Sequence, residues 1–410
     1  MSFITQQILT NCFGIENYEI EKVFEEGERI IFELKRTCAY FCGKCGCIGG
    51  KYDFSIQEIL IGTLNLKPLY ARLKVYRIKC PMCCKVTTER HGVSEGKKRY
   101  SKAVEKTTVY YTEKLDNAST AKLFGVSEMS VYRMDFSGLS KLENQYLKNL
   151  PKPSCLTVDE ASYKRMHNYA TIISSYKDGK VLWAEQGRKQ SDLARGYNQL
   201  EPALADVKAV SMDLWRAYES ATKTKLPSAD IIYDRFHIAR LINRAIEKER
   251  RLYQKTLADK DRKIMKKHSR WILLKRNVNL TEKNKDHLAQ LKKVNKTLYD
   301  IYLMKECFLS IFDQFLPIKL ARKQMFNWIR DMLKTDFEYL KRFARSILKR
   351  MRSILHWFKN PISNGKAEGI NNVIKTLIKR AYGYKNFDYL RMKILQKCGY
   401  LMNYVNHSFC

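Results

Sequence analysis

The sequence lacks any long uninterrupted hydrophobic run. A membrane-spanning helix needs about 18 or more consecutive apolar residues, and the stretch from Ile301 to Leu320 is interrupted by four charged residues. The first 15 residues contain neither the basic segment nor the apolar segment of a secretory signal. We therefore expect a protein of the reducing cytoplasm that has no membrane partner.

Acidic residues are scarce, because 42 Asp and Glu stand against 76 Lys and Arg and leave a formal net charge of +34. Such a surplus repels itself in the folded state and favours a polyanionic partner, nucleic acid first and an anionic membrane second. A phosphate-binding loop of the G-x-x-x-x-G-K-[ST] type is also missing, so ATP hydrolysis is not indicated. The 410 residues are 45% hydrophobic, which excludes a wholly disordered chain and allows two to four domains.

Composition divides the chain into six segments that together predict a multidomain α/β protein. Residues 1–35 form a short preface, residues 36–95 hold most of the cysteines, and residues 96–148 are helical. Residues 154–237 alternate strands and helices, with a hairpin at Asp178-Gly179, as in an α/β domain. Residues 238–355 are helical and basic, with 18 basic against six acidic residues from Arg244 to Lys296. Residues 356–402 contain a strongly periodic helix.

Seven of the twelve cysteines lie between residues 38 and 84. In a cytosolic protein such a cluster indicates a metal site rather than disulfides. The C-x-x-C turns Cys42–Cys45 and Cys80–Cys83 offer four thiolates, which complete the tetrahedral shell of a structural Zn²⁺. Unliganded core or redox cysteines are the alternative, and Cys38, Cys47 and Cys84 leave the ligand set open. From residue 67 to 106, 12 basic against three acidic residues favour a DNA-binding zinc ribbon over a solvated charged face.

Asn117–Met134 predicts a helix-turn-helix. Gly125 supplies the turn, and Ser127 is a suitable N-cap for a second helix that would enter the major groove of DNA. Any two-helix corner is the alternative interpretation. Two side chains of the second helix are expected to face DNA: Ser130 and Arg133.

Carboxylates follow two predicted strands. Asp159 follows Leu156–Val158, and Asp213 follows Val207–Met212. Functional groups gather at the carboxyl ends of strands in α/β sheets, so the two carboxylates converge if the strands are neighbours. Two polar residues follow the next strand and either support the carboxylates, bind DNA phosphate or are structural: Asp234 and His237.

A third carboxylate lies in the periodic helix that Asn364 can cap. Apolar residues recur on one face of this helix from Ile370 to Ala381. On another face, Glu368 is followed at helical spacing by an amide and two cations: Asn372, Lys375 and Lys379. An ordinary amphipathic surface helix gives the same stripe. The order of the polar residues nevertheless suits a metal ligand followed by phosphate-binding groups, and three oxygen ligands from separate elements suit Mg²⁺ or Mn²⁺.

Together these motifs resemble the ISL3 family of insertion-sequence transposases, in the same order from about Thr37 to about Met402. The segments that carry the resemblance are Arg77–Cys83, Asn117–Met134, Val158–Glu160, Val210–Tyr218, Asp234–His237, Ser363–Asn372 and Arg380–Asn386.

The resemblance implies an RNase H-like catalytic domain with a DDE triad of Asp159, Asp213 and Glu368, interrupted by the basic helical region as an insertion. It implies two Mg²⁺ or Mn²⁺ ions at the triad, hydrolysis at the terminal inverted repeats of the element, and attack of the freed 3′-OH on target DNA. Because two ends must be synapsed, we expect a homodimer. The family also implies a bacterial cytoplasmic protein associated with the nucleoid.

Two other functions fit part of the pattern. A non-catalytic DNA-binding repressor or a decayed transposase would need no acidic residues, and the presence of all three counts against it. A metal-dependent RNase H-like nuclease would cut DNA without joining ends.

Overall fold

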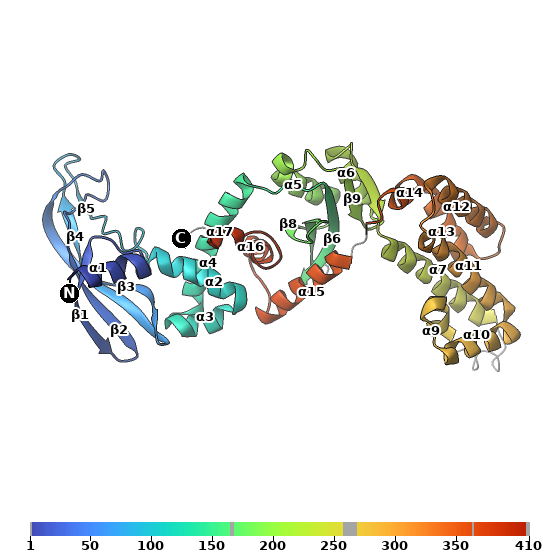
Figure 1. Cartoon of the computed structure of the whole chain (residues 1–410), viewed down its shortest axis with the longest axis horizontal. Coiled ribbons are helices and arrows are strands. Elements are labelled where there is room, and N and C mark those ends of the chain that lie inside the picture. The colour runs from blue at the N-terminus through green and yellow to red at the C-terminus, as the bar shows by residue number, and fades with distance from the viewer. Residues whose placement is uncertain (1, 165–167, 257–268, 363–364, 407–410) are drawn as a thin grey trace. The chain divides into compact units, whose positions relative to one another are not determined.

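The computed structural model describes residues 2–164, 168–256, 269–362 and 365–406, and the chain forms two compact units (Figure 1). The first unit comprises residues 1–149 and 377–410, and the second comprises residues 150–376. Each contains one mixed five-stranded sheet and several helices. Within the described ranges, no helix is long and apolar enough to cross a membrane. The two sheets with their helices confirm the predicted multidomain architecture of mixed sheets and helices.

The first unit begins with a sheet in the order β1-β2-β4-β3, with β5 paired to β4. The elements are α1 Ser2–Phe13, β1 Tyr18–Glu26, β2 Arg29–Arg36, β3 Gly50–Leu64, β4 Lys67–Lys79 and β5 Val86–Thr88. Leu9 of α1 packs on the sheet face where alternate residues of β4, such as Leu69 and Leu73, are buried. Because β2 pairs with β4, residues 1–35 belong to the sheet of the cysteine-rich segment and are not a separate preface.

Three helices follow the sheet: α2 Lys102–Lys114, α3 Asn117–Phe124 and α4 Glu128–Lys148. Gly125 ends α3 in the left-handed conformation with φ +60°, and the Ser127 side chain accepts a hydrogen bond from the backbone N–H of Ser130 at the start of α4. The turn and the cap thus lie where the sequence predicts them. Buried Phe124 and Val131 join the two helices in one hydrophobic cluster.

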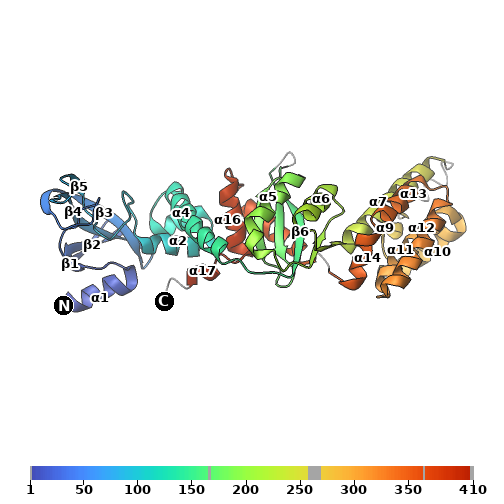
Figure 2. The same cartoon turned by 90° about the horizontal axis from the view of Figure 1, so that it is seen from above.

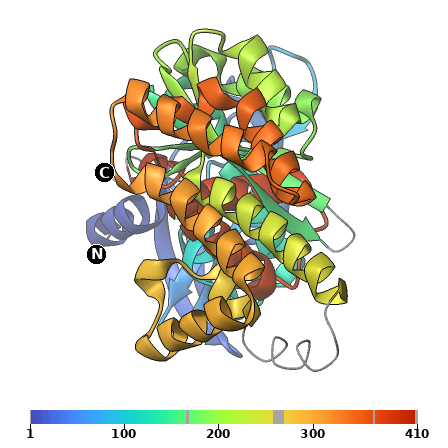
Figure 3. The same ribbon diagram turned by 90° about the vertical axis from the view of Figure 1, so that its right-hand side faces the viewer.

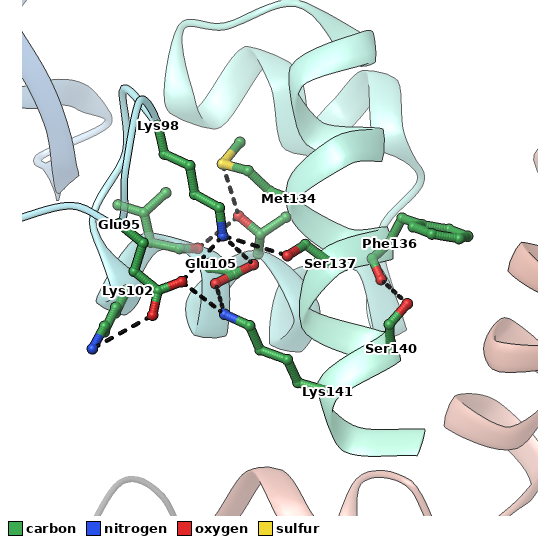
Figure 4. A network of polar contacts seen from close by, with 11 residues as sticks. Glu95, Lys98, Lys102, Glu105, Met134, Phe136, Ser137, Ser140 and Lys141 are labelled. Carbon is green, nitrogen blue, oxygen red and sulfur yellow. Dashed lines mark hydrogen bonds and ion pairs between the residues drawn. The ribbon is translucent and has the colours of Figure 1, made fainter. Parts of the chain in front are cut away.

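A polar network fixes the start of α2 against α4 (Figure 4). The buried carboxylate of Glu105 accepts hydrogen bonds from Lys98 and Lys141 at 3.3 and 2.7 Å. Glu95 accepts from the same two lysines at 3.4 and 3.3 Å. Burial alone would raise the pKa of Glu105, but the contacts with Lys141 and its neighbours outweigh burial and hold this pKa below its ordinary value. Glu105 is therefore a buried charge that is compensated.

The C-terminal helix α16, Phe387–Cys398, packs on α2 and α4 and is followed by α17, Asn403–Asn406. Asp135 of α4 and Lys393 of α16 form a buried ion pair of 3.1 Å. The same carboxylate accepts hydrogen bonds of 2.6 Å from Tyr389 and Thr112. The sequence predicts that residues 356–402 all belong to the catalytic core, and this is wrong for residues 377–402, because the buried network holds α16 in the first unit.

We expect Asp135→Ala to destabilise the first unit by about 3–5 kcal/mol, because the substitution leaves the buried ammonium of Lys393 without its carboxylate. Chemical denaturation followed by circular dichroism measures the change. Asp388→Ala is the control: it removes the exposed partner of an ion pair with Arg391, and such pairs contribute about 1 kcal/mol or less. Equal losses in the two variants would show that the buried pair has no special role.

The second unit is built on a sheet in the order β10-β9-β6-β7-β8. Its strands are β6 Cys155–Lys164, β7 Asn168–Ser175, β8 Val181–Gln186, β9 Ala209–Met212 and β10 Asp230–Tyr233. β6, β7 and β8 are antiparallel, and β9 and β10 continue the sheet in parallel with β6. The hairpin predicted at Asp178-Gly179 is the β7–β8 connection.

Two helices of the second unit pack against each other: α5 Gln190–Leu200, continued by the 3₁₀ turn Glu201–Ala203, and α6 Arg216–Lys225. α5 also packs on β7 and β8. Gly196 permits the close approach, because a Cβ there would lie 2.9 Å from the Ile173 side chain. Since α5 and α6 both start near the ends of strands, their first residues lie beside the sheet edge that carries the predicted site.

The region from residue 238 to 355 contains helices and short connections, and no strand among its described residues. Its helices are α7 Arg235–Thr256, α9 Ser269–Leu274, α10 Glu282–Val294, α11 Lys296–Asp313, α12 Ile318–Leu333, α13 Glu338–Lys349 and α14 Met351–Lys359, with a 3₁₀ turn at Asn277–Asn279. α7, α11, α12 and α13 lie side by side (Figures 2 and 3). Phe308 forms their aromatic core with Trp328 and Phe343. Residues 257–268 of the predicted basic stretch lie outside the described residues.

Candidate active site and metal centre

Four cysteine sulfurs of the first unit converge on one point. The Sγ atoms of Cys42, Cys45, Cys80 and Cys83 all lie within 4.8 Å of one another, and the Cys42–Cys83 and Cys45–Cys80 pairs are 3.7 and 3.4 Å apart. Four sulfurs placed about 2.3 Å from a tetrahedral zinc ion would be about 3.8 Å apart. The spacing therefore fits a metal ion bound by the four cysteines that the two C-x-x-C turns predict.

The backbone of the two turns explains this convergence. The backbone N–H of Cys42 donates a hydrogen bond to the Cys47 carbonyl at 2.8 Å. Position 43 requires glycine, because a Cβ there would lie 2.0 Å from the Thr88 carbonyl oxygen. The Thr87 hydroxyl lies 3.2 Å from Cys42 Sγ and, with nearby backbone N–H groups, lowers the pKa of Cys42 to about 5. The surplus cysteines, among the described residues, are not part of the cluster: Cys38, Cys47 and Cys84.

The two predicted aspartates of the second unit lie at the end of one strand pairing. The parallel pairing of β6 with β9 ends at Val158 and Met212, and Asp159 and Asp213 are the residues that follow them in the chain. β6 itself continues to Lys164 because it also pairs with β7, so Asp159 lies inside a strand that is longer than predicted. The two carboxylates nevertheless share one edge of the β6–β9 pair, as the sequence predicts.

The electrostatics of this edge suit a cation. Burial and the neighbouring carboxylate of Asp213 raise the pKa of Asp159 to about 6. Oδ1 of Asp213 is buried and lies 2.7 Å from Nδ1 of His237. The same nitrogen lies 3.0 Å from Oδ2 of Asp234, so one ring nitrogen faces both carboxylates. Neighbouring carboxylates of this kind supply the oxygen ligands that a hard metal ion prefers.

Asp234 and His237 support this edge from the start of α7. Burial alone would lower the pKa of His237, but the carboxylates of Asp213 and Asp234 outweigh burial and raise it to about 9. His237 is therefore charged in the metal-free protein at neutral pH, and it lies between two carboxylates. Its geometry favours a supporting role near the aspartates over a free DNA ligand.

Asn371 is a site residue that the sequence pattern did not predict. It belongs to helix α15, Gly365–Arg380, and its Nδ2 donates hydrogen bonds to Asp159 Oδ2 at 2.8 Å and to the Glu160 carbonyl at 3.3 Å. Its Oδ1 is buried without a hydrogen-bond partner. Two signals in the sequence could have pointed to it: it lies within the family-like segment Ser363–Asn372, and it is three residues from Glu368, which places the two side chains on one helix face.

Glu368 is exposed and lies one helical turn from Asn371, about 4.5 Å along the helix axis. Within the described residues, its carboxylate does not join those of Asp159 and Asp213 in a group close enough to surround a single ion. The other polar residues predicted on this face are also exposed: Asn372, Lys375 and Lys379.

The apolar stripe of α15 is narrower than predicted. Ile370 and Ile374 are buried, but Val373 is exposed, so the helix covers less of the core. Lys366 fixes the start of the helix to the β7–β8 turn by donating to the Lys177 carbonyl at 2.6 Å. The predicted cap Asn364 lies outside the described residues.

The predicted DNA-facing residues lie at the start of α4. Arg133 is exposed, whereas Ser130 is half-buried, and its hydroxyl lies 3.0 Å from that of Ser127. Arg133 is thus the more accessible of the two.

The family model and the curated relatives that match this chain are transposases. Residues 156–394 match a family model described as transposase of the ISL3 type. Over 406 residues, 95% of this chain and 98% of the relative, the chain is 25% identical to the transposase for insertion sequence element IS1001 of Bordetella parapertussis. It is 22% identical to the transposase for insertion sequence element IS1557 of Mycobacterium tuberculosis, covering 91% of this chain and 89% of the relative. A chain of the Drosophila P element transposase strand transfer complex is similar with a TM-score of 0.34 at 9% identity, over 73% of this chain and 92% of that one.

Proposed function

Because the chain belongs to the ISL3 family of insertion-sequence transposases, we propose that it cuts DNA at the terminal inverted repeats of its element and joins the freed 3′-OH to target DNA. The observation that carries this proposal is the pair of Asp159 and Asp213 at the end of the β6–β9 pairing, with His237 2.7 Å from the Asp213 carboxylate. The antiparallel β6, β7 and β8 followed by parallel β9 and β10 support an RNase H-like sheet for the catalytic domain.

In this proposal Asp159, Asp213 and Glu368 hold Mg²⁺ or Mn²⁺, which when bound supplies positive charge to the attacking and leaving oxygens of an in-line phosphoryl displacement. The chain's own residues orient the ligands. Asn371 donates to Asp159 Oδ2, which fixes that carboxylate. His237 is held by Asp234 against Asp213. Glu368, exposed on the same helix face as Asn371, would be the third ligand by family motif.

The first unit supplies DNA binding in this proposal. The zinc ribbon of Cys42, Cys45, Cys80 and Cys83 and the exposed Arg133 of α4 contact the inverted repeat, and Ser130 contributes at the same helix start. Lys375 and Lys379, exposed on α15, contact DNA phosphates. The net charge of +34 supports a large phosphate contribution, so affinity falls steeply with salt. Two copies act together, because two element ends must be joined.

Metal-dependent cleavage of a labelled duplex that carries the element's own end tests the proposal. We expect a nick at the end with Mg²⁺ or Mn²⁺, no nick with EDTA, and joined products when target DNA is added, because the 3′-OH made in the first step is the nucleophile of the second. A duplex with a scrambled end is the control. Tight binding without cleavage under any divalent metal would instead support a DNA-binding repressor, and cleavage without joining would support a nuclease.

A further inference from the structure

A pocket of about 370 Å³ lies on the second unit beside the aspartate edge. It is formed by the start of β7, the loop from β8 to α5 and the turn that follows β9, with Tyr169, Arg188, Lys189, Gln190, Trp215 and Ala217 among its lining residues. Its volume is within the range of small-ligand pockets, about 300–1,000 Å³. None of these residues has a role in the cleavage chemistry proposed above.

Trp215 is the unusual member of the wall. It lies two residues after Asp213 at the N-cap of α6, and its side chain makes no capping hydrogen bond. Ser, Thr, Asp and Asn are preferred at N-caps, because their side chains accept hydrogen bonds from the first helical N–H groups. A tryptophan at this position does not stabilise the helix in that way. The ring is 46% exposed, yet its Nε1 donates to the Arg188 carbonyl at 3.3 Å. A large aromatic ring is thus held in a defined position with much of its surface uncovered.

Arg188 connects this ring to the predicted active site. Its guanidinium lies over the Tyr169 ring at 4.1 Å and near the Trp215 ring at 5.6 Å. One of its nitrogens is 3.6 Å from the carboxylate of Glu160, the residue after Asp159. Arg188 of the pocket wall thus contacts the residue after Asp159, and Trp215 of the same wall lies two residues after Asp213.

The charge of the pocket suits a nucleotide. Lys189 is the N-cap of α5 and Trp215 is the N-cap of α6, so two helices begin at the pocket, and the backbone N–H groups of a first helical turn have no partner within the helix. The acidic group in the wall, Asp192, accepts hydrogen bonds from the Lys189 N–H at 2.7 Å and from Arg195 at 2.9 Å, so its charge is compensated. Cationic side chains and helix starts attract phosphate, and the aromatic ring offers a stacking surface.

We propose that this pocket binds one nucleotide of the element end whose base has left the duplex, with the base stacked on Trp215 and its phosphate near Arg188 and Lys189. The inference rests on the proposed transposase function and adds a nucleobase-binding site to it. Extrusion of a base costs a few kcal/mol, and stacking on an aromatic side chain offsets a similar amount. The pocket thereby holds the strand in register at the phosphate that faces the aspartates.

Photocrosslinking tests the site directly. 5-Iodouracil is placed at successive positions on both sides of the cleavage point of the element end, and the complex is formed with Ca²⁺ and irradiated. We expect one position to crosslink to the peptide that contains Trp215, because iodouracil reacts with aromatic rings on which it stacks. Trp215→Ala should abolish the crosslink, and Trp215→Phe should retain it. Cleavage of the same duplex in Mg²⁺ without a crosslink to this peptide at any position would overturn the pocket alone, whereas loss of both would overturn the proposed function as well.

Cleavage rates give an independent readout. We expect Trp215→Ala to bind the element end like wild type but to cleave it roughly ten- to a hundredfold more slowly, the effect of one lost stacking contact. A mismatch at the crosslinking position should restore part of this loss, because an unpaired base leaves the duplex at lower cost, and mismatches elsewhere should not. Phe326→Ala, which removes another exposed ring (56%) on α12 of the same unit, is the matched control. A slow Trp215→Ala variant that no mismatch position rescues would indicate a purely structural role and overturn the proposal.

Discussion

Asp213→Asn is expected to abolish metal-dependent cleavage while end binding persists. The substitution keeps the shape of the side chain but removes the charge of a half-buried carboxylate that lies beside Asp159 and contacts His237 at 2.7 Å. Charge stabilisation by a bound metal is worth several kcal/mol in the transition state, so the rate should fall at least about a thousandfold. Binding should remain, because the cysteine cluster and Arg133, to which we assign end binding, belong to the other compact unit.

The control for Asp213→Asn is Asp206→Asn, which makes the same change of charge at an exposed position of the same unit. Single-turnover cleavage and equilibrium binding of one labelled duplex measure both effects for each variant. Glu368→Gln belongs to the same series, because Glu368 is exposed and assigned only by its motif. Full cleavage by Glu368→Gln would show that Glu368 is not a member of the triad. Full cleavage by Asp213→Asn would contradict the proposed catalytic site as a whole.

The strands around this site could be predicted from the sequence because each is a short apolar run with a turn signal beside it. The β7–β8 hairpin and the start of β10 at Asp230 follow directly from such runs. The convergence of Asp159 and Asp213 required one further condition, that β6 and β9 pair, and the structure meets that condition. Strand pairing depends on contacts between distant segments. The sequence therefore predicts the two strands but not that they are neighbours.

Other features depended on contacts that carry no local pattern. Asp135 and Lys393 are 258 residues apart in the chain, and nothing near either residue indicates that α16 joins the first unit. Asn371 lies next to the predicted Asn372, but adjacent side chains are about 100° apart around a helix axis, so the rotational position of α15 decides which amide meets Asp159. The cysteine cluster could be predicted from the sequence, because each C-x-x-C turn places two of the four ligands by local spacing alone. Only the meeting of the two turns depends on contacts between distant segments, here the pairing of β3 with β4.

Cys80→Ser is expected to remove the metal from the ribbon and to unfold this end of the first unit. Binding of zinc at four-ligand structural sites contributes about 10–16 kcal/mol in small zinc-binding domains, and this free energy becomes folding free energy. Cys80 is buried and follows β4 directly, so loss of the metal frees the end of the longest hairpin in the sheet. Zinc content per chain, limited proteolysis and thermal unfolding report the effect.

Cys84→Ser is the matched control, because Cys84 adjoins the same turn and yet its sulfur is not part of the four-sulfur cluster. We expect this variant to keep one zinc per chain and wild-type proteolysis. Equal zinc content in Cys80→Ser and the wild type would show that the four sulfurs hold no metal. End binding connects this result to the first prediction: Cys80→Ser should weaken binding and therefore cleavage, whereas Asp213→Asn should weaken cleavage alone. This difference tests the proposed division of labour, in which the first unit recognises the element end and the second cuts it, and neither variant could test it by itself.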